Sequence, residues 1–315
     1  KITIIPDDVL AYVPFEVLVS REQSFNRISY GKLAYLVKDH QIGYSYSAKV
    51  LYNQLPDGKE KGRRLAAFAP TYDNIQRLTE IESPTRQQYR EKLYPLKGIK
   101  KEAEKITNII RGDIYADYEA TESRFKEKSG QYDILHLAMH TLVNDQNPMY
   151  SKMAFTQHEE SPEDGFLNTY EIYSLNLDSR MAVLSSCNTG SGKLEKGEGV
   201  ISLARGFKYA GCPSIVMTMW PVEDNSSIRL MEYFYQSIAR GKSKDEALRA
   251  AKIKFLNNSD PLHAHPYFWA GYILIGDQSA LYTPPWVWWS LGAAGLLLLG
   301  GIILIIRKKI TGRSS

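Results

Sequence analysis

Cysteine is scarce in this sequence, with two residues among 315. Cys187 and Cys212 are too few to build a disulfide framework. No period of 20–50 residues appears, which excludes a solenoid or a propeller for this stretch of chain. The histidines outside the predicted strands lie scattered in polar segments without metal-ligand spacing, and residues 190–193 lack the spacing and helix of a phosphate loop. We therefore expect neither a metal nor a cofactor.

The chain also lacks an excess of one charge over most of its length. It has 39 Lys and Arg against 35 Asp and Glu, a net charge of +4. Arg307, Lys308, Lys309 and Arg313 all lie in the last nine residues, which leaves 35 basic and 35 acidic residues elsewhere. A near-neutral folded part argues against a nucleic-acid-binding surface, so we expect no nucleic-acid partner.

Short apolar runs that stop at turns predict strands, and amphipathic segments between them predict helices. Residues 99–110 carry isoleucine and alanine at spacings of 4, 3 and 4, which is one face of a helix. Thr121, Asn225 and Ser243 are predicted to begin three further helices. This alternation is typical of an α/β fold with parallel strands. The predicted strands include residues 65–70, 132–140, 181–184, 213–219 and 272–276.

Two of these strands lead to residues that suit cysteine chemistry. One ends at His140, and another runs through two serines to Cys187 and a glycine-containing loop. The carboxyl ends of parallel strands are where ligands and chemistry collect, so we expect these two residues to be neighbours. A histidine beside a cysteine can favour the thiolate and later protonate a leaving amine. His136 is interpreted as a packed structural histidine, and Cys212 as a buried core residue.

Six segments of the chain, in this order, resemble the CHAT domain. They are residues 136–140 (HLAMH), 184–190 (LSSCNTG), 197–199 (GEG), 202–207 (SLARGF), 210–211 (AG) and 219–224 (MWPVED). The family is caspase-like, is related to separase and is usually attached to tetratricopeptide repeats. The resemblance implies a caspase-like, mostly parallel sheet flanked by helices on both faces. It also implies a cysteine peptidase whose dyad is His140 and Cys187.

The same resemblance places the oxyanion site at the backbone amides of Thr141 and Cys187. The family usually has glycine after the catalytic histidine, where this chain has Thr141. The candidate substrate-binding residues are Asn188, Glu198, Glu223 and Asp224. Glu198 either caps the following helix or lines the substrate cleft. Glu223 and Asp224 are either solvated loop charges or an acidic pocket for a basic side chain at the cleavage site.

The composition changes after the last predicted strand. Residues 286–306 are 21 residues without a charge, close to the roughly 20 that span a bilayer, with tryptophans at one end. We predict a CHAT domain at 1–280, a linker at 281–285, a transmembrane helix at 286–306 and a basic tail at 307–315. The tail favours the cytoplasmic side, which predicts a single-pass membrane protein, in contact with lipid, whose catalytic domain is extracytoplasmic or periplasmic.

The chain begins directly with strand-like residues, without an initial Met or a signal peptide, and we expect an N-terminal repeat region to be missing from it. Two functions remain open. The first is a membrane-anchored cysteine endopeptidase that hydrolyses peptide bonds of a protein or peptide substrate through the Cys–His dyad. The second is a catalytically silent CHAT module that acts as a membrane-tethered binding or signalling scaffold.

Overall fold

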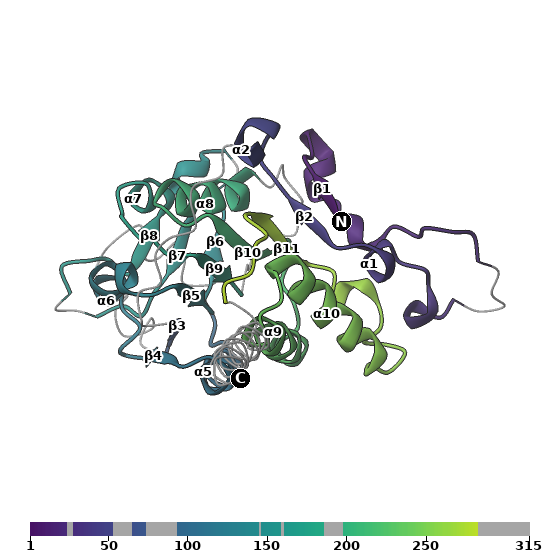
Figure 1. Cartoon of the computed structure of the whole chain (residues 1–315). Coiled ribbons are helices and arrows are strands. Elements are labelled where there is room, and N and C mark those ends of the chain that lie inside the picture. Colours follow the sequence, from purple (N-terminus) through teal and green to yellow (C-terminus); the bar gives the residue numbers. More distant parts are fainter. Residues whose placement is uncertain are drawn as a thin grey trace, which may run out of the picture.

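The computed structural model describes residues 1–23, 28–52, 65–73, 93–144, 146–158, 161–185 and 198–282. Within these ranges, an eight-stranded sheet runs through the molecule and helices cover both of its faces (Figure 1). The strand order is β1-β2-β11-β10-β9-β5-β3-β4. Among the described strands of this sheet, neighbours are parallel except at β10 and β11, which confirms the predicted α/β fold with a mostly parallel sheet.

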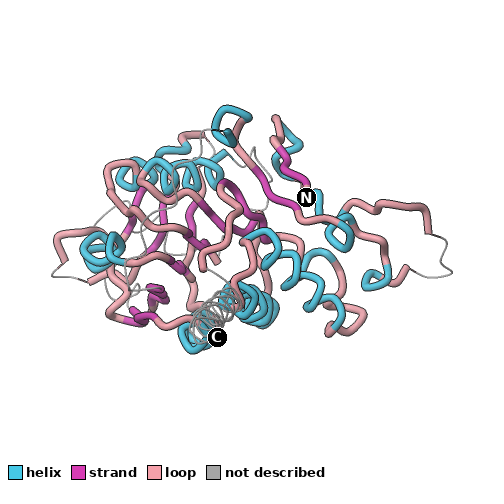
Figure 2. Tube along the Cα trace, viewed as in Figure 1, coloured by secondary structure: helices cyan, strands magenta, loops and turns pink. Residues whose placement is uncertain are grey.

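The bounds of the five strands predicted from apolar runs agree with the structure to within a few residues, and the sheet also contains a strand at residues 112–117 that the sequence analysis did not predict. In spatial order the strands of the sheet are β1 (Ile2–Ile4), β2 (Ile42–Tyr44), β11 (Tyr272–Gly276), β10 (Ser214–Thr218), β9 (Met181–Leu184), β5 (Ile134–Leu137), β3 (Leu65–Pro70) and β4 (Gly112–Asp117). A second, antiparallel sheet contains β6 (Thr141–Leu142), β7 (Lys152–Ala154) and β8 (Phe166–Asn168). These strands, among the magenta segments in Figure 2, are too short to show a period in the sequence.

Alternate residues of the central strands pack against opposite helical layers. In β9, Met181 and Val183 belong to one core, while Ala182 and Leu184 belong to the other. The first core packs against α5 (Ile99–Ile109), α9 (Asp224–Ala239) and α10 (Lys244–Asn257). The second packs against α6 (Glu122–Lys128), α7 (Thr169–Ile172) and α8 (Glu198–Tyr209). Two further short helices are α1 (Leu36–Asp39) and α2 (Ala48–Tyr52).

The helix starts confirm one predicted capping bond and correct two others. The Thr121 hydroxyl accepts a hydrogen bond from the first turn of α6, as predicted. Ser243 precedes α10, but its side chain makes no capping bond. Helix α9 begins one residue before Asn225, because the carboxylate of Glu223 accepts the backbone N–H groups of Asn225 and Ser226. A charged acceptor at a helix start also interacts favourably with the helix dipole, so Glu223 and not Asn225 is the cap.

A buried ion pair attaches the N-terminal segment to the rest of the molecule. Lys252 of α10 donates to the Glu16 carboxylate at 2.7 Å, and the Tyr44 hydroxyl donates to its other oxygen at 2.5 Å. The Phe15 N–H in turn donates to the Tyr44 hydroxyl. All three polar groups are buried, so residues from the beginning, from β2 and from α10 share one network.

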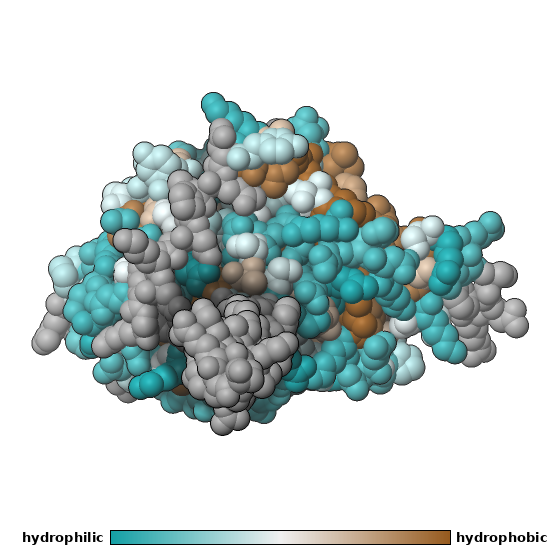
Figure 3. All heavy atoms as spheres, viewed as in Figure 1, coloured by the Kyte–Doolittle hydropathy of each residue, from teal (hydrophilic) through white to brown (hydrophobic). Residues whose placement is uncertain are grey.

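The face of the molecule seen in Figure 3 is mostly hydrophilic. Hydrophobic atoms gather over β1 and the 3-10 helix η1 (Asp8–Tyr12), where the side chains of Ile5, Val9 and Leu10 are exposed.

The lengths and composition of the described helices bear on the predicted membrane localisation. No helix among the described residues is long and apolar enough to span a bilayer, which contradicts the predicted single-pass membrane localisation. The predicted transmembrane stretch itself, 286–306, lies outside the described residues, as does the basic tail.

Candidate active site

The register of two neighbouring strands aligns the segments that lead toward the two residues of the predicted dyad. Leu137 of β5 is paired with Leu184 of β9, and the Ser185 N–H donates to the Leu137 carbonyl at 3.0 Å. His140 and Cys187 each follow that pair by three residues. Cys187 lies outside the described residues, but the strand that leads to it is described as far as Ser185.

His140 is fully buried, and its surroundings define its tautomer. Its Nε2 lies 2.7 Å from the backbone carbonyl of Tyr94, and the rings of Tyr72 and Tyr94 pack against it. A carbonyl can only accept, so Nε2 carries the proton and Nδ1 is the basic nitrogen. Burial lowers the pKa of His140 below its usual value, and the Tyr94 carbonyl opposes this effect in part. The ring is therefore held as a neutral base.

Tyr72 shapes the chain at His140. Its hydroxyl accepts the His140 backbone N–H at 3.0 Å and donates to the Ala154 carbonyl at 2.8 Å. The Ala154 N–H donates to the His140 carbonyl at 2.9 Å. The hydroxyl thus takes the place of one ladder bond between the two segments. Because a trans peptide directs its C=O and N–H in opposite directions, the Thr141 N–H points away from β7.

Thr141 fits its position without backbone strain. It forms the first residue of β6, opposite Met153, and its side chain is buried. Among the described non-glycine residues, positive φ occurs at Asp8, Asp117 and Asp178, and not at Thr141. A β-branched residue suits an extended strand, so the backbone here does not require glycine.

A pocket of about 600 Å³ opens beside His140. It is lined by Tyr94, whose carbonyl holds His140, and by the first turns of α5 and α9. Lys97 and Lys101 contribute basic side chains to the wall, and Asp224 contributes an acidic one. His140 itself does not line this pocket, and Tyr94 is the residue that the two have in common.

The two predicted acidic residues have different environments in this pocket. Glu223 is engaged as the cap of α9, and the N–H and hydroxyl groups that it binds lower the pKa of its carboxyl despite burial. Asp224 is exposed as a whole residue, but its carboxyl is partly shielded from solvent. This partial desolvation, followed by the charges of Glu223 and Glu102, raises the pKa of the carboxyl, while the Gly98 N–H opposes the rise. Asp224 is thus the acidic group that remains available to a ligand.

The other predicted substrate-binding residues lie at the margin of what the structure describes. Asn188 falls outside the described residues. Glu198 is the first residue of α8, and its side chain is likewise outside the description. Cys212 is described and is fully buried, with its Sγ donating to the Ser214 carbonyl, as expected for a core residue.

A buried polar cluster lies beneath this edge of the sheet, and we call it the Glu102 cluster. Its members are Glu102, His136, Ser185, Ser227, Tyr235 and Tyr272. His136 is buried as predicted, but it is bound by a carboxylate that the sequence analysis did not identify. The available signal was Glu102 itself, a charged residue on the apolar face formed by Ile99, Ala103 and Ile106.

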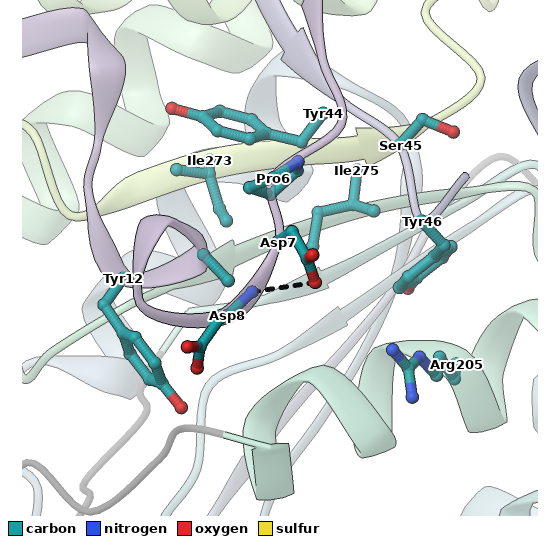
Figure 4. A pocket seen from close by; sticks show the side chains of 11 residues that line it. Pro6, Asp7, Asp8, Tyr12, Tyr44, Ser45, Tyr46, Arg205, Ile273 and Ile275 are labelled. Carbon is teal, nitrogen blue, oxygen red and sulfur yellow. Dashed lines mark hydrogen bonds between the residues drawn. The ribbon is translucent and has the colours of Figure 1, made fainter. Parts of the chain in front are cut away.

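Two other features are separate from the His140 region. A pocket of about 410 Å³, lined by Asp7, Tyr46 and Arg205 among others, lies over β2 and β11 on the α8 side of the sheet (Figure 4). Asp7 there accepts the Asp8 N–H, so its carboxylate supports the local turn. None of the residues lining this pocket lines the one beside His140.

Three carboxylates, Glu122, Glu163 and Glu171, come close enough to share a cation. The ammonium of Lys126 already lies 2.7, 2.9 and 2.9 Å from them. Burial raises the pKa of Glu122 to about 7, an effect that Lys126 opposes and the two other carboxylates increase. The lysine supplies the positive charge that a metal would bring, so this group is an internal ion-pair network.

The protein is thus an α/β protein with a mostly parallel sheet. A buried neutral histidine lies beyond the carboxyl end of one central strand, and Tyr94 connects it to a pocket. The chain belongs to the CHAT domain family, whose model matches residues 1–277. Similar curated proteins are tetratricopeptide repeat protein 28 of Homo sapiens, 27% identical over 221 residues, and that of Mus musculus, 24% identical. Each match covers 60% of this chain and 9% of the relative, so the chain spans under a tenth of their length.

Two solved structures show some likeness to this chain. One is the Saccharomyces cerevisiae separase–securin complex, with 13% identity, a TM-score of 0.44, and coverage of 79% of this chain and 14% of that one. Another is the Arg-specific cysteine proteinase gingipain R, with 12% identity, a TM-score of 0.40, and coverage of 77% and 55%. These scores are too low for the likeness to carry any argument about the site.

Proposed function

We propose that this chain is a cysteine endopeptidase that cleaves a protein or peptide substrate, with Cys187 as nucleophile and His140 as base. The observation that supports the proposal is the register of β5 and β9, in which Leu137 is paired with Leu184, each three residues before one member of the proposed dyad. The fixed tautomer of His140 adds support, because it leaves Nδ1 able to accept a proton.

The proposed chemistry proceeds through an acyl-enzyme. His140 Nδ1 takes the thiol proton as Cys187 Sγ bonds to the substrate carbonyl carbon, which gives a tetrahedral oxyanion. The C–N bond then breaks, and His140 gives its proton to the leaving amine. Water attacks the thioester with His140 as base, and the proton returns to Sγ as the acid product leaves. The amides of Thr141 and Cys187 are proposed to stabilise the oxyanion, a role that fits a Thr141 N–H directed away from β7.

We further propose that Asp224 binds a basic side chain next to the cleaved bond. It is the exposed carboxylate in the pocket beside His140, while Glu223 is engaged in capping α9. Asn188 and Glu198 remain candidates for contacts to the substrate backbone, on their positions in the sequence alone.

The test is a peptide-library cleavage assay on the purified chain, with Cys187→Ala and His140→Ala as loss-of-function variants. Both should abolish cleavage, since each removes one half of the dyad. Cys212→Ala is the matched control, because Cys212 is buried in the core, away from the pocket, and should leave the rate unchanged. Cleavage that survives Cys187→Ala would refute the proposal. A wild-type chain that cuts nothing in the library would favour the silent binding module instead.

A further inference from the structure

We propose that the Glu102 cluster positions the catalytic dyad, by joining the strand that leads to His140 to the strand that leads to Cys187. This inference rests on the proposed function and assigns a role to residues that take no part in the chemistry above. Glu102, His136, Ser185 and Tyr272 are positioning residues in it, since they act through the strand ends and touch no reacting atom.

One carboxylate oxygen holds both strands. Oε1 of Glu102 lies 2.9 Å from Nε2 of His136, on β5, and accepts the hydroxyl of Ser185, at the end of β9. His136 is four residues before His140, and Ser185 is two residues before Cys187. A shift of the Glu102 carboxylate would therefore displace both the segment before His140 and the segment before Cys187.

Ser185 is held at every polar atom. Its N–H donates to the Leu137 carbonyl at 3.0 Å, and its own carbonyl accepts the Tyr272 hydroxyl at 3.1 Å. Its hydroxyl donates to Glu102 and also lies 3.2 Å from that of Ser227. Two residues of chain span at most about 7 Å, so the position of Ser185 restricts the positions that Cys187 can occupy.

The second oxygen of Glu102 anchors the cluster to helix α9. It accepts the Ser227 hydroxyl at 2.7 Å, and Ser227 in turn lies 2.7 Å from the Tyr272 hydroxyl of β11. Glu102 and Ser227 are each the fourth residue of their helices, α5 and α9, and the carboxylate is surrounded by polar contacts to His136, Ser185 and Ser227. This arrangement explains how a charged group is tolerated with 3% of its surface exposed.

A purely structural role would be better served by apolar residues. Taking a carboxylate out of water costs several kcal/mol, and well-packed hydrophobic replacements for buried charges are often as stable or more so. What such replacements cannot supply is directional bonding to two strand ends at once. A misplacement of about 1 Å at a reacting atom can cost about 100-fold in rate, so directional bonds that fix the two strand ends would maintain the rate of the reaction.

The test uses two nearly isosteric variants, Tyr272→Phe and Glu102→Gln, in the full chain. Two readouts are measured: kcat and KM on a cleaved peptide, and the rates of iodoacetamide labelling at the two cysteines by peptide mass spectrometry. We expect kcat to fall about tenfold or more in each variant, with KM changed by less than about twofold. Labelling of Cys187 should slow in parallel, because the thiol loses its base, while buried Cys212 should stay protected.

Matched controls come from the same elements. Glu104→Gln changes an exposed carboxylate two residues along α5, and Tyr233→Phe removes a hydroxyl from α9 outside the cluster. Both should leave kcat and Cys187 labelling unchanged.

Three outcomes overturn the inference or separate it from the proposed function. Unchanged kcat and unchanged Cys187 labelling in Tyr272→Phe and Glu102→Gln would refute positioning. Labelling of Cys212 that rises with the loss of activity would also refute it, because the cluster would then only hold the core together. A wild-type chain that cleaves no peptide, yet shows slower Cys187 labelling in both variants, would refute the peptidase while the positioning role stands.

Discussion

At the scale of single residues, burial and one backbone carbonyl define the state of His140. The Tyr94 carbonyl occupies Nε2, and desolvation by burial keeps the ring from taking up a second proton. The same residue Tyr94 also forms part of the pocket wall. His140 and the pocket thus share Tyr94 as a neighbour.

The lowered pKa of His140 predicts the acid limit of activity. The base works in its neutral form, so kcat/KM should stay high as the pH falls to the usual histidine value of 6.5 and decline only below it. A pH profile of peptide cleavage measures this midpoint, with circular dichroism at each pH to exclude unfolding. His158→Asn, at an exposed position, should give the same profile. A midpoint above 6.5 would show that His140 is not the group that titrates.

Asp224 predicts substrate choice. Asp224→Asn should reduce kcat/KM for a peptide with Arg or Lys beside the cut by about 10–100-fold, because a charge-assisted hydrogen bond is lost. A peptide with an uncharged residue at that position should be cleaved equally by both forms. Steady-state kinetics on the peptide pair measure the difference. Equal losses on the two peptides would mean that Asp224 supports the fold of the pocket and does not bind the basic side chain of the substrate.

At the scale of elements, two helices begin at the site. The first turns of α5 and α9 line the pocket and also supply Glu102 and Ser227 to the cluster beneath it. The start of α9 depends on Glu223, whose two oxygens accept two backbone N–H groups that no helical carbonyl can reach. The position of Asp224 therefore depends on a neighbouring side chain that is not itself available to substrate.

Removing this cap should loosen the start of α9. Glu223→Ala is expected to lower the free energy of unfolding by about 0.5–2 kcal/mol, the usual cost of a lost N-cap. Thermal or urea unfolding followed by circular dichroism measures the change. Glu104→Ala, at an exposed position inside α5, is the comparison and should stay near wild type. If the two variants were equally stable, the Glu223 bonds would contribute nothing measurable to the helix.

At the scale of the whole molecule, contacts far apart in the chain connect its layers. Glu16 and Lys252, 236 residues apart, pair in the interior where the N-terminal segment meets α10. Burial lowers the pKa of Lys252, and the Glu16 carboxylate opposes this effect. The pair thus ties the segment before β2 to the helical layer of the first core.

Breaking one half of this pair should be costly. Glu16→Gln is expected to destabilise the chain by roughly 3–5 kcal/mol, because it leaves the Lys252 ammonium buried without a counter-charge. The double variant Glu16→Gln with Lys252→Met should recover much of that loss in urea unfolding. Glu22→Gln, an exposed carboxylate on the same segment, serves as the control. A double variant no more stable than the single one would show that packing, and not charge, carries the effect.

Local patterns in the sequence determined the elements and part of the site. The apolar runs at Leu65–Pro70 and Tyr272–Gly276 are strands with the predicted bounds, and Thr121 begins a helix as its side chain predicts. This works because strand burial and helix capping depend on residues within a few positions of one another. The pairing of the His140 and Cys187 strands followed from the same parallel-sheet logic.

The tertiary structure decided what depends on distant partners. The Tyr94 carbonyl at His140 and the reversal of β11 against β10 have no local signature. The Glu102 cluster is the clearest case, since Glu102 meets His136 across 34 residues and Ser227 across 125. A sequence period records which face of an element is buried, but only folding selects the group that a buried charge will meet.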